Sequence, residues 1–386
     1  MILNIFDRNE SRFLSILGFS LGLRQMALIM FAPFISIYGK SLEGQTPALI
    51  GLSLGIYGLT QAIFQTPFGS WSDRYGRKII VIIGMVQLLV GLLLAAVANH
   101  IYLFLFARAL QGSGAISAVA YAWIGDRIPN HKRDRGMGIL GIIIGIEALL
   151  SLIAGPFLYK IFSMPQIFLL CAGIVFISVI IVSLFLKKEK IEFSAKASFS
   201  GLLAVARDVT ILKVSIAGFT TNYSLFASLY IVPILLEREL DPGNFWRIFV
   251  PAVFVGILVL YFASRQSDSG FFREVVVIFL GIIALAGAAL LIDNVLLIAT
   301  AFLFIIVGYI NMLVILPANI TKLAGSGMRG KTTGYFNTIH VIGEFMGASV
   351  TGILWGIHQN LPVVLMIALA ILGILLIATV DVKRFK

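Results

Sequence analysis

Residues 61–78 read QAIFQTPFGSWSDRYGRK and separate two long apolar segments of the chain. Asp73, Arg74, Arg77 and Lys78 bring three positive charges and one negative charge into this short stretch. Its two glycines permit close helix contact or unusual backbone angles where the chain reverses. The stretch therefore predicts a tight, positively charged hinge between two membrane-length helices.

The composition indicates an all-α membrane protein. Of the 386 residues, 59% are hydrophobic and 12% are charged, and the mean hydropathy is +1.02. A soluble domain is about a quarter charged. The single cysteine, Cys171, excludes a disulfide framework and a thiol-rich metal motif. The net charge of +11 would suggest nucleic acid in a soluble protein, but here the positive charges gather between apolar segments, so we expect no nucleic-acid partner.

A membrane-spanning helix needs about 20 mostly apolar residues. On this criterion the sequence predicts twelve transmembrane helices, near 13–37, 48–70, 79–98, 102–124, 137–158, 166–186, 210–236, 245–264, 274–292, 295–320, 334–357 and 361–380.

The distribution of Lys and Arg predicts the orientation. The segments that would lie outside hold only Lys40, Lys160, Arg238 and Arg247, whereas the alternate segments hold most of the others. Cytoplasmic loops carry the excess of Lys and Arg. We therefore expect a multi-pass protein of the cytoplasmic (inner) membrane with both termini in the cytoplasm.

The chain divides into two halves. Residues 187–208 form a polar stretch that reads as a cytoplasmic linker between six-helix halves at 1–186 and 209–386. The two halves show a faint repeat. When they are aligned with a shift of 194 residues, Phe68 matches Phe262 and Gly76 matches Gly270, although the charges of the hinge are not repeated. Two pseudo-symmetric halves with a site between them near mid-membrane are one plan of secondary transporters.

Several motifs carry a family resemblance. The order Gly-x-x-x-Asp-Arg-x-Gly-Arg-Lys at 69–78 resembles the loop between the second and third helices of the major facilitator superfamily. Residues 108–114, RALQGSG, resemble its fourth-helix pattern, and Gly155-Pro156 resembles part of its antiporter pattern. Residues 48–62 are similar to the YajR-type drug-efflux branch. The resemblance implies the major facilitator fold.

The resemblance also implies a cytoplasmic gate motif, in which Asp73, Arg77 and Asp126 form a charge cluster. Asp73 would also face the positive N-terminal end of the eleventh helix near Gly334. The alternative is a set of exposed ion pairs that stabilise by less than about 1 kcal/mol each. The full gate motif comprises Gly69, Asp73, Arg74, Gly76, Arg77, Lys78 and Asp126. Residues expected to serve helix packing are Gln111, Gly112, Gly114, Gly155 and Pro156.

Four ionisable residues lie within predicted spans: Arg24, Arg108, Glu147 and Glu344. A charge at the bilayer centre costs at least ~3 kcal/mol, so such residues are functional candidates. Three of the four, all but Arg108, fall near the middle of their helices, which suggests a shared polar cavity. The alternative is a structural ion pair between Arg24 and Glu147. By resemblance, Arg108 would contact the first helix inside the cavity and tune a neighbouring acid, so both arginines are candidates for proton coupling together with the two glutamates.

Asn337, His340 and Glu344 recur at i, i+3 and i+7, so they share one face of the eleventh helix. Histidine titrates near neutral pH, and a neighbouring carboxyl group could exchange a proton with it. We expect Glu344 to be the proton carrier and Glu147 to be paired with Arg24 or Arg108. The alternative is a polar seam between packed helices.

Aromatic side chains could line an apolar substrate cavity together with Asn337. The candidates are Phe31, Tyr38, Tyr121, Tyr223, Phe226 and Tyr230. The sequence contains no phosphate-cradling Gly-rich Lys motif, no metal-ligand cluster and no nucleophile beside a base. We therefore expect neither an ATP-driven pump nor an enzyme, and no cofactor or metal.

These patterns predict a monomeric secondary transporter that works by alternating access, with the lipid bilayer, protons and a small molecule as partners. The preferred hypothesis is proton-coupled export of a small amphipathic compound, although Tyr159-Lys160 stand where the antiporter pattern usually has Gly-Gly. One alternative is a proton-coupled or facilitative carrier of a metabolite, siderophore or lipid. A more distant one is a non-transporting membrane sensor.

Overall fold

A computed structural model describes residues 6–186, 202–323 and 328–381. In these ranges the regular secondary structure is helical, which confirms the predicted all-α class. The helices are α1 (Arg8–Ile29), η2 (Ala32–Phe34), α2 (Ile35–Gly39), α3 (Pro47–Tyr75), α4 (Arg77–Ala96), α5 (Ile101–Ser113), α6 (Ser117–Arg127), α7 (Asn130–Ile161), α8 (Met164–Phe185), α9 (Leu202–Arg207), α10 (Val209–Leu236), η3 (Pro242–Asn244), α11 (Trp246–Gln266), η4 (Ser267–Phe271), α12 (Phe272–Leu290), α13 (Val295–Leu323), α14 (Arg329–Ile357) and α15 (Leu361–Ala378).

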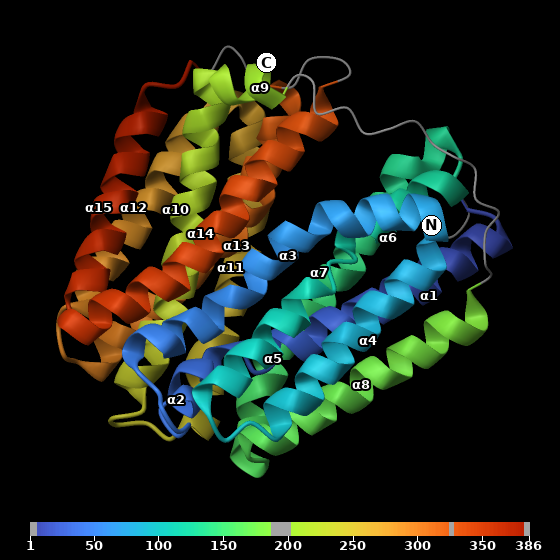
Figure 1. Cartoon of the computed structure of the whole chain (residues 1–386). Coiled ribbons are helices and arrows are strands. Elements are labelled where there is room, and N and C mark those ends of the chain that lie inside the picture. The colour runs from blue at the N-terminus through green and yellow to red at the C-terminus, as the bar shows by residue number, and fades with distance from the viewer. Residues whose placement is uncertain (1–5, 187–201, 324–327, 382–386) are drawn as a thin grey trace. The chain divides into compact units, whose positions relative to one another are not determined.

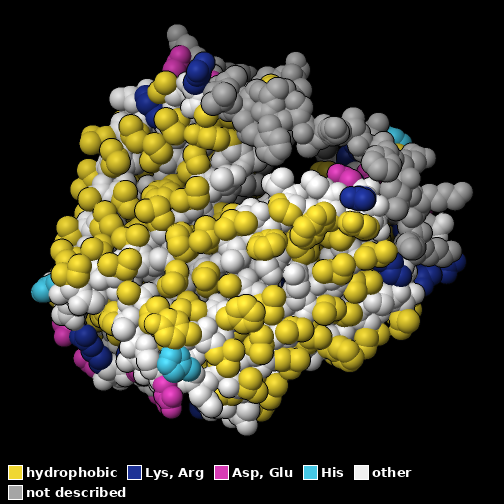
Figure 2. Space-filling view, in the orientation of Figure 1, with side chains coloured by type: hydrophobic (Ala, Val, Ile, Leu, Met, Phe, Trp, Pro, Cys, Tyr) yellow, Lys and Arg dark blue, Asp and Glu magenta, His cyan; other side chains and the backbone are white. Residues whose placement is uncertain are grey.

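Ten stretches of described residues are long and apolar enough to cross a membrane. One of them, Pro242–Leu290, contains both α11 and α12, and α14 is a further long helix. The helices are consistent with the twelve predicted spans. Figure 2 shows hydrophobic side chains along the visible sides of the helices, while charged side chains gather towards the helix ends. This distribution is the one that a hydrocarbon solvent requires.

Several helices differ from their predicted extents. The first predicted span, 13–37, is divided into α1, η2 and α2. α3 continues through the hinge motif to Tyr75 and α4 starts at Arg77, so Gly76 is the one residue between them. The predicted fourth span is not continuous, because Gly114, Ala115 and Ile116 separate α5 from α6. The predicted linker lies largely outside the described residues, apart from α9 and its neighbours.

The chain forms two compact units, described here as far as their residues are placed. The first draws on Met1–Pro33, Leu42–Gly44 and Leu59–Lys196, and the second on Phe34–Ser41, Gln45–Gly58 and Ala197–Lys386. The first part of α3 therefore belongs to the second unit, and the rest of α3 belongs to the first.

In the first unit, α1 packs against α7 and α8, while α4 packs against α5 and α8. Trp123 of α6 is fully buried and meets Phe13 of α1 edge to face, with 5.5 Å between ring centroids. The Arg127 guanidinium lies 4.8 Å from the centre of the same Phe13 ring. Aromatic packing of this kind adds ~0.5–1.5 kcal/mol beyond area burial.

In the second unit, α14 lies against α10 and against the first part of α3 through small residues. A Cβ at Gly343 or Gly347 would stand 2.5 Å from a backbone oxygen of α10. On another face, a Cβ at Gly51 would stand 2.5 Å from the Ala348 carbonyl oxygen. Backbones can approach this closely only where side chains are absent, so glycine fixes both helix contacts.

We expect Gly347→Ala to lower the apparent melting temperature of the purified protein by several degrees. The added Cβ overlaps the Tyr223 carbonyl, and overpacking of this kind costs ~1–3 kcal/mol. The matched control is Gly281→Ala in α12, where a Cβ meets nothing within 4 Å. That control should keep or raise the melting temperature, because Gly→Ala in a helix gains ~0.5–1 kcal/mol. Equal melting temperatures for the two variants would contradict the glycine contact.

Candidate functional site

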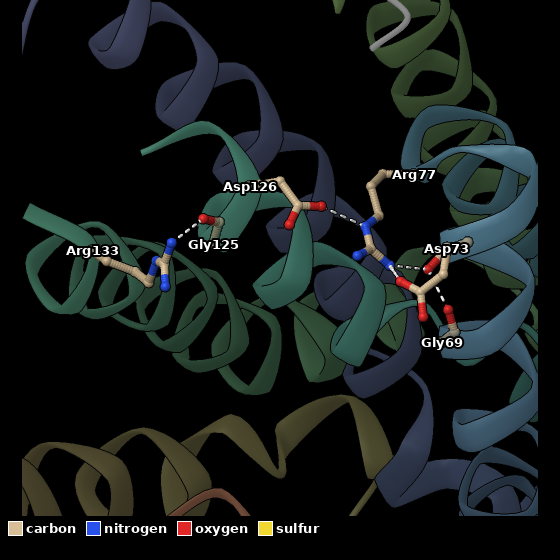
Figure 3. Close-up of polar contacts among 7 residues, drawn as sticks. Gly69, Asp73, Arg77, Gly125, Asp126 and Arg133 are labelled. Atoms are coloured by element: carbon tan, nitrogen blue, oxygen red, sulfur yellow. Dashed lines mark hydrogen bonds and ion pairs between the residues drawn. The ribbon is translucent and has the colours of Figure 1, made fainter. Parts of the chain in front are cut away.

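Arg77 joins α3, α4 and α6 at the predicted cytoplasmic end of the first unit (Figure 3). Its Nε donates to Asp126 Oδ2 at 2.8 Å, and its Nη1 lies 2.5 Å from Asp73 Oδ1. Nη1 also donates to the Ser72 hydroxyl, which in turn donates to the Gly69 carbonyl. One guanidinium therefore serves two carboxylates and a hydroxyl.

The local backbone brings these groups together. Gly76 has φ +95° and ψ 143°, a conformation that side chains other than glycine rarely adopt. This single residue ends α3 and starts α4, so Asp73 and Arg77 remain four residues apart on the two sides of the turn. Lys78 donates to the Ser183 carbonyl of α8 at 2.7 Å, and the Arg74 guanidinium lies over the Tyr75 ring. The motif anchors the start of α4.

The charges of this cluster are not balanced. The Arg77 side chain is 11% exposed, whereas Asp73 and Asp126 are each 47% exposed. Two carboxylates share one cation, so the cluster as a whole is negative. Either carboxylate alone can pair with the guanidinium. Removing both would leave the largely buried Arg77 cation without an anionic partner, which is energetically costly. The predicted contact of Asp73 with the region of Gly334 stays a prediction.

The second unit carries a related cluster that the sequence comparison of the halves missed. Lys322 of α13 lies 3.1 Å from Asp268 Oδ1, and Asn319 Nδ2 donates to the Ser267 hydroxyl at 3.1 Å. Gly270 nearby has φ +98°, as Gly76 has +95° in the first unit. Shifts of 195 and 196 residues relate Asp73 to Asp268 and Asp126 to Lys322. These shifts differ by one and two residues from the shift of 194 that aligns Gly76 with Gly270, so no single shift aligns all of these positions.

The predicted ion pair between Arg24 and Glu147 is absent from the described part of the chain. Arg24 is 2% exposed, and its Nη2 donates to the Gly114 carbonyl at 3.1 Å. The Glu147 carboxyl group instead lies against Gly22, and its Oε2 has no hydrogen-bond partner among the described residues. Successive helix residues are about 100° apart, so Gly22 and Arg24 point to different sides of α1. Arg24 and Glu147 therefore do not pair, although the sequence places them at a similar depth in the membrane.

Arg108 and Gln111 form a buried pair on α5. Arg108 Nη1 donates to Gln111 Oε1 at 2.6 Å, and Gln111 Nε2 donates to the Gly91 carbonyl of α4 at 3.1 Å. The guanidinium also lies 5.3 Å from the centre of the Phe31 ring. A Cβ at Gly114 would overlap the carbonyl of Gly84, so α4 and the end of α5 cross without side chains between them. This motif combines a polar network with close packing.

The His340–Glu344 face of α14 lies near three other elements of the second unit: α10, the first part of α3 and α13. The His340 ring stacks on Phe336 at 5.7 Å, and the backbone carbonyl of His340 accepts from Asn222 Nδ2 of α10 at 2.7 Å. The Glu344 carboxyl group packs against Gly58, where a Cβ would stand 2.8 Å from the carboxyl carbon. Tyr309 of α13, which sequence reasoning missed, lies within electrostatic range of Glu344.

The other predicted residues occupy varied environments. Phe31 is fully buried and packs on Phe168 with ring centroids 4.9 Å apart. Tyr223 is 1% exposed, whereas Tyr121 is 39% exposed. Phe226 is intermediate and Asn337 is exposed, while Gly112, Gly155 and Pro156 are buried. Tyr38 is half-buried, and the Tyr230 hydroxyl donates to the Pro47 carbonyl. Among the described residues no cluster of His, Cys, Asp or Glu could hold a metal ion.

Comparisons with known proteins give a consistent picture. A family model described as Major Facilitator Superfamily matches residues 14–348. The chain is 28% identical over 351 residues to an uncharacterized transporter of Buchnera aphidicola subsp. Baizongia pistaciae, covering 86% of this chain and 87% of that one. It is 27% identical over 359 residues to the inner membrane transport protein YajR of Escherichia coli, covering 89% and 77%.

Two further similarities extend over almost the whole chain. The quinolone resistance protein NorA of Staphylococcus aureus is 22% identical over 387 residues, covering 96% and 97%. Among solved structures, a bacterial homologue of the human lysosomal transporter Spinster, inward-facing and occupied, superposes with a TM-score of 0.79. That superposition covers 97% of each chain at 13% identity, so it supports the fold alone.

A double-mutant cycle tests the Arg77 cluster. We expect Asp73→Asn and Asp126→Asn each to destabilise the purified protein by less than about 1 kcal/mol, because the other carboxylate still pairs with Arg77. The double variant should lose more than the sum, since it leaves a largely buried guanidinium without a carboxylate. Apparent melting temperatures measure the cycle, with the exposed Glu239→Gln as a control. Strict additivity would show that the carboxylates do not share Arg77.

Proposed function

The chain belongs to the Major Facilitator Superfamily of membrane transporters, and from this premise we propose that it couples the export of a small amphipathic compound to proton entry. Transport would proceed by alternating access. The similarity to the quinolone resistance protein NorA supports export, and the similarity to the inner membrane transport protein YajR supports transport across that membrane. In this proposal the protein acts as a monomer in the cytoplasmic membrane, with both termini in the cytoplasm.

The observation that carries the proposal is the pair of carboxyl groups inside membrane spans. Glu147 is 9% exposed, and Glu344 packs against a glycine of α3. Glu344 is partly buried, and Glu147 Oε2 has no hydrogen-bond partner among the described residues. Burying the Glu147 carboxylate in this way costs several kcal/mol, whereas the protonated group is neutral and easier to bury. Groups in such sites are suited to take up and release protons as their surroundings change. A sensor without transport would not need them.

His340 and Arg108 would act beside these carboxyl groups. His340 lies one turn from Glu344 on α14, which suits proton exchange between the two side chains. Arg108 is held by Gln111 and Phe31 and would bring positive charge to the interior of the first unit. Because Arg24 does not pair with Glu147, both glutamates remain proton-carrier candidates, and we assign the role to Glu344 on account of its histidine neighbour.

The Arg77 cluster would serve as the latch of the cytoplasmic gate. Arg77 at the start of α4 pairs with Asp126 at the end of α6 and with Asp73 in the last turn of α3. Both carboxylates are half-exposed, so each ion pair alone is weak, as a gate that opens in each cycle requires. The Lys322–Asp268 pair would play the corresponding part in the second unit.

The second candidate function is a carrier of one defined metabolite, siderophore or lipid, with or without proton coupling. The observation that keeps it open is the Tyr159-Lys160 pair, which stands where the antiporter pattern usually has Gly-Gly. Proton flux separates the two functions. Vesicles that contain the purified protein and an internal pH dye would be screened with pools of drugs, sugars and lipids. Substrate-dependent proton movement supports the first function, and uptake or exchange without it supports a facilitative carrier.

The orientation can be tested by cysteine labelling in a Cys171→Ser background. A cysteine at Ser194, in the predicted cytoplasmic linker, should resist an impermeant thiol reagent added to intact cells. A cysteine at Gln45, in the first predicted external segment, should react. The positive-inside distribution of Lys and Arg is the reason for this expectation. Labelling of position 194 from outside would overturn the topology.

The proton carrier can be tested with matched substitutions. We expect Glu344→Gln to abolish substrate movement driven by a pH gradient alone, while downhill exchange of the same substrate persists, because the amide cannot take up a proton. Glu147→Gln, measured in parallel, should retain part of the gradient-driven transport. The measurement uses a substrate found in the pool screen and vesicles with an imposed pH gradient. Gradient-driven transport by Glu344→Gln would transfer the carrier role to Glu147.

A further inference from the structure

The break in the predicted fourth span leaves a helix N-terminus inside the first unit. α5 ends at Ser113 and α6 begins at Ser117, near the middle of the span predicted at 102–124. Ile116 precedes α6 and provides no side-chain cap. The first N–H groups of a helix have no partner within that helix and carry a partial positive charge. Irregular backbone at membrane depth is tolerated where protein or a water-filled cavity surrounds it.

Arg24 of α1 points to this break. Its Nη2 donates to the Gly114 carbonyl at 3.1 Å, and Gly114 directly precedes the turn into α6. The side chain is 2% exposed, and its Nε has no partner among the described residues. A buried guanidinium with an unused donor, next to a helix N-terminus, brings two positive features together.

Ser20 adds a third donor on the same side of α1. It lies four residues before Arg24, so both side chains share one helix face. Ser20 is fully buried, and its hydroxyl has no hydrogen-bond partner among the described residues. Ser117 and Ala118 at the start of α6 are partly exposed, so the N-terminus itself remains accessible.

The nearby charges leave Arg24 without a carboxylate. Glu147 lies against Gly22, on a different side of α1, and no ion pair joins Glu147 to Arg24 within the described residues. Around the break, Arg24 Nε and the Ser20 hydroxyl therefore remain hydrogen-bond donors without a partner among the described residues.

We infer that Arg24, Ser20 and the N-terminus of α6 bind an anionic group of the transported compound, a carboxylate or a phosphate monoester. Helix N-termini and guanidinium groups are the two protein features best suited to such oxygen anions. This inference rests on the proposed transport of a small amphipathic molecule and assigns its charge. Glu344 and Glu147 then handle protons, while Arg24 handles the substrate.

A binding assay on the purified full chain in neutral-lipid nanodiscs tests the inference. The probes are octanoate and octyl phosphate, with octanol and octylamine as neutral and cationic comparisons of the same chain length. The wild-type protein should bind the two anions at least about tenfold more tightly than octanol, as expected for charge-assisted hydrogen bonds. Inorganic phosphate distinguishes the source of the anion. If it competes, the site takes a free anion, and if it does not, the alkyl chain is part of the ligand; both results support the site.

Substitutions then separate recognition from structure. Arg24→Gln should weaken anion binding about tenfold or more and leave octanol binding unchanged. Arg24→Lys should retain part of the anion preference. If Arg24→Gln fails to fold, Ser117→Asp serves instead: a carboxylate in the first turn of a helix is stabilising, and here it would also repel the anion. The control is Arg12→Gln, an exposed arginine on the same helix, which should bind like the wild type.

Two results would overturn the inference: equal affinity for octanol and the anions, or an anion preference that survives both Arg24→Gln and Ser117→Asp. Arg24 would then only cap the Gly114 carbonyl. A different result would reject the proposed function. Anion binding without gradient-driven transport would reject proton coupling alone, and gradient-driven transport without an anion preference would reject this site alone.

Discussion

Hydrocarbon offers no hydrogen-bond partner, so every polar group within a membrane span must find one inside the protein. This constraint explains the arrangement around the fourth span. Where α5 ends, the Gly114 carbonyl accepts from Arg24, and the Gly91 carbonyl of α4 accepts from Gln111. Gln111 in turn accepts from Arg108. Arg24 is thus partly satisfied by one backbone carbonyl and Arg108 by one side-chain amide.

The same solvent also removes the ordinary hydrophobic attraction between helices, so close packing must hold them together. In the second unit α14 packs on α10 through Gly343 and Gly347, and on the first part of α3 through Gly352. The Glu344 carboxyl group lies against Gly58 at one end of the α3 contact. A titratable group placed at a contact without intervening side chains is sensitive to any change in that contact. Such placement would couple protonation to helix movement.

The two clusters at the predicted cytoplasmic ends use similar positions with different chemistry. In the first unit a buried guanidinium connects two carboxylates, and in the second a lysine meets one carboxylate directly. A guanidinium can serve several acceptors in fixed directions, whereas an ammonium acts as a point charge. The second cluster gains its fixed geometry from the buried bond between Asn319 and Ser267. Each unit thus has its own way to hold a helix end.

The sequence alone determined the membrane class, the approximate spans and the hinge motif, because these depend on composition, on length and on local order. Hydrocarbon requires runs of about 20 apolar residues, and only glycine readily adopts the backbone angles of Gly76. The tertiary structure decided which polar groups meet. Arg24 and Glu147 share a depth, but the rotation of α1 and the break after α5 send Arg24 to Gly114 and leave Glu147 against Gly22. Depth follows from position along one helix, whereas contact depends on the rotation and packing of several helices, which no single segment encodes.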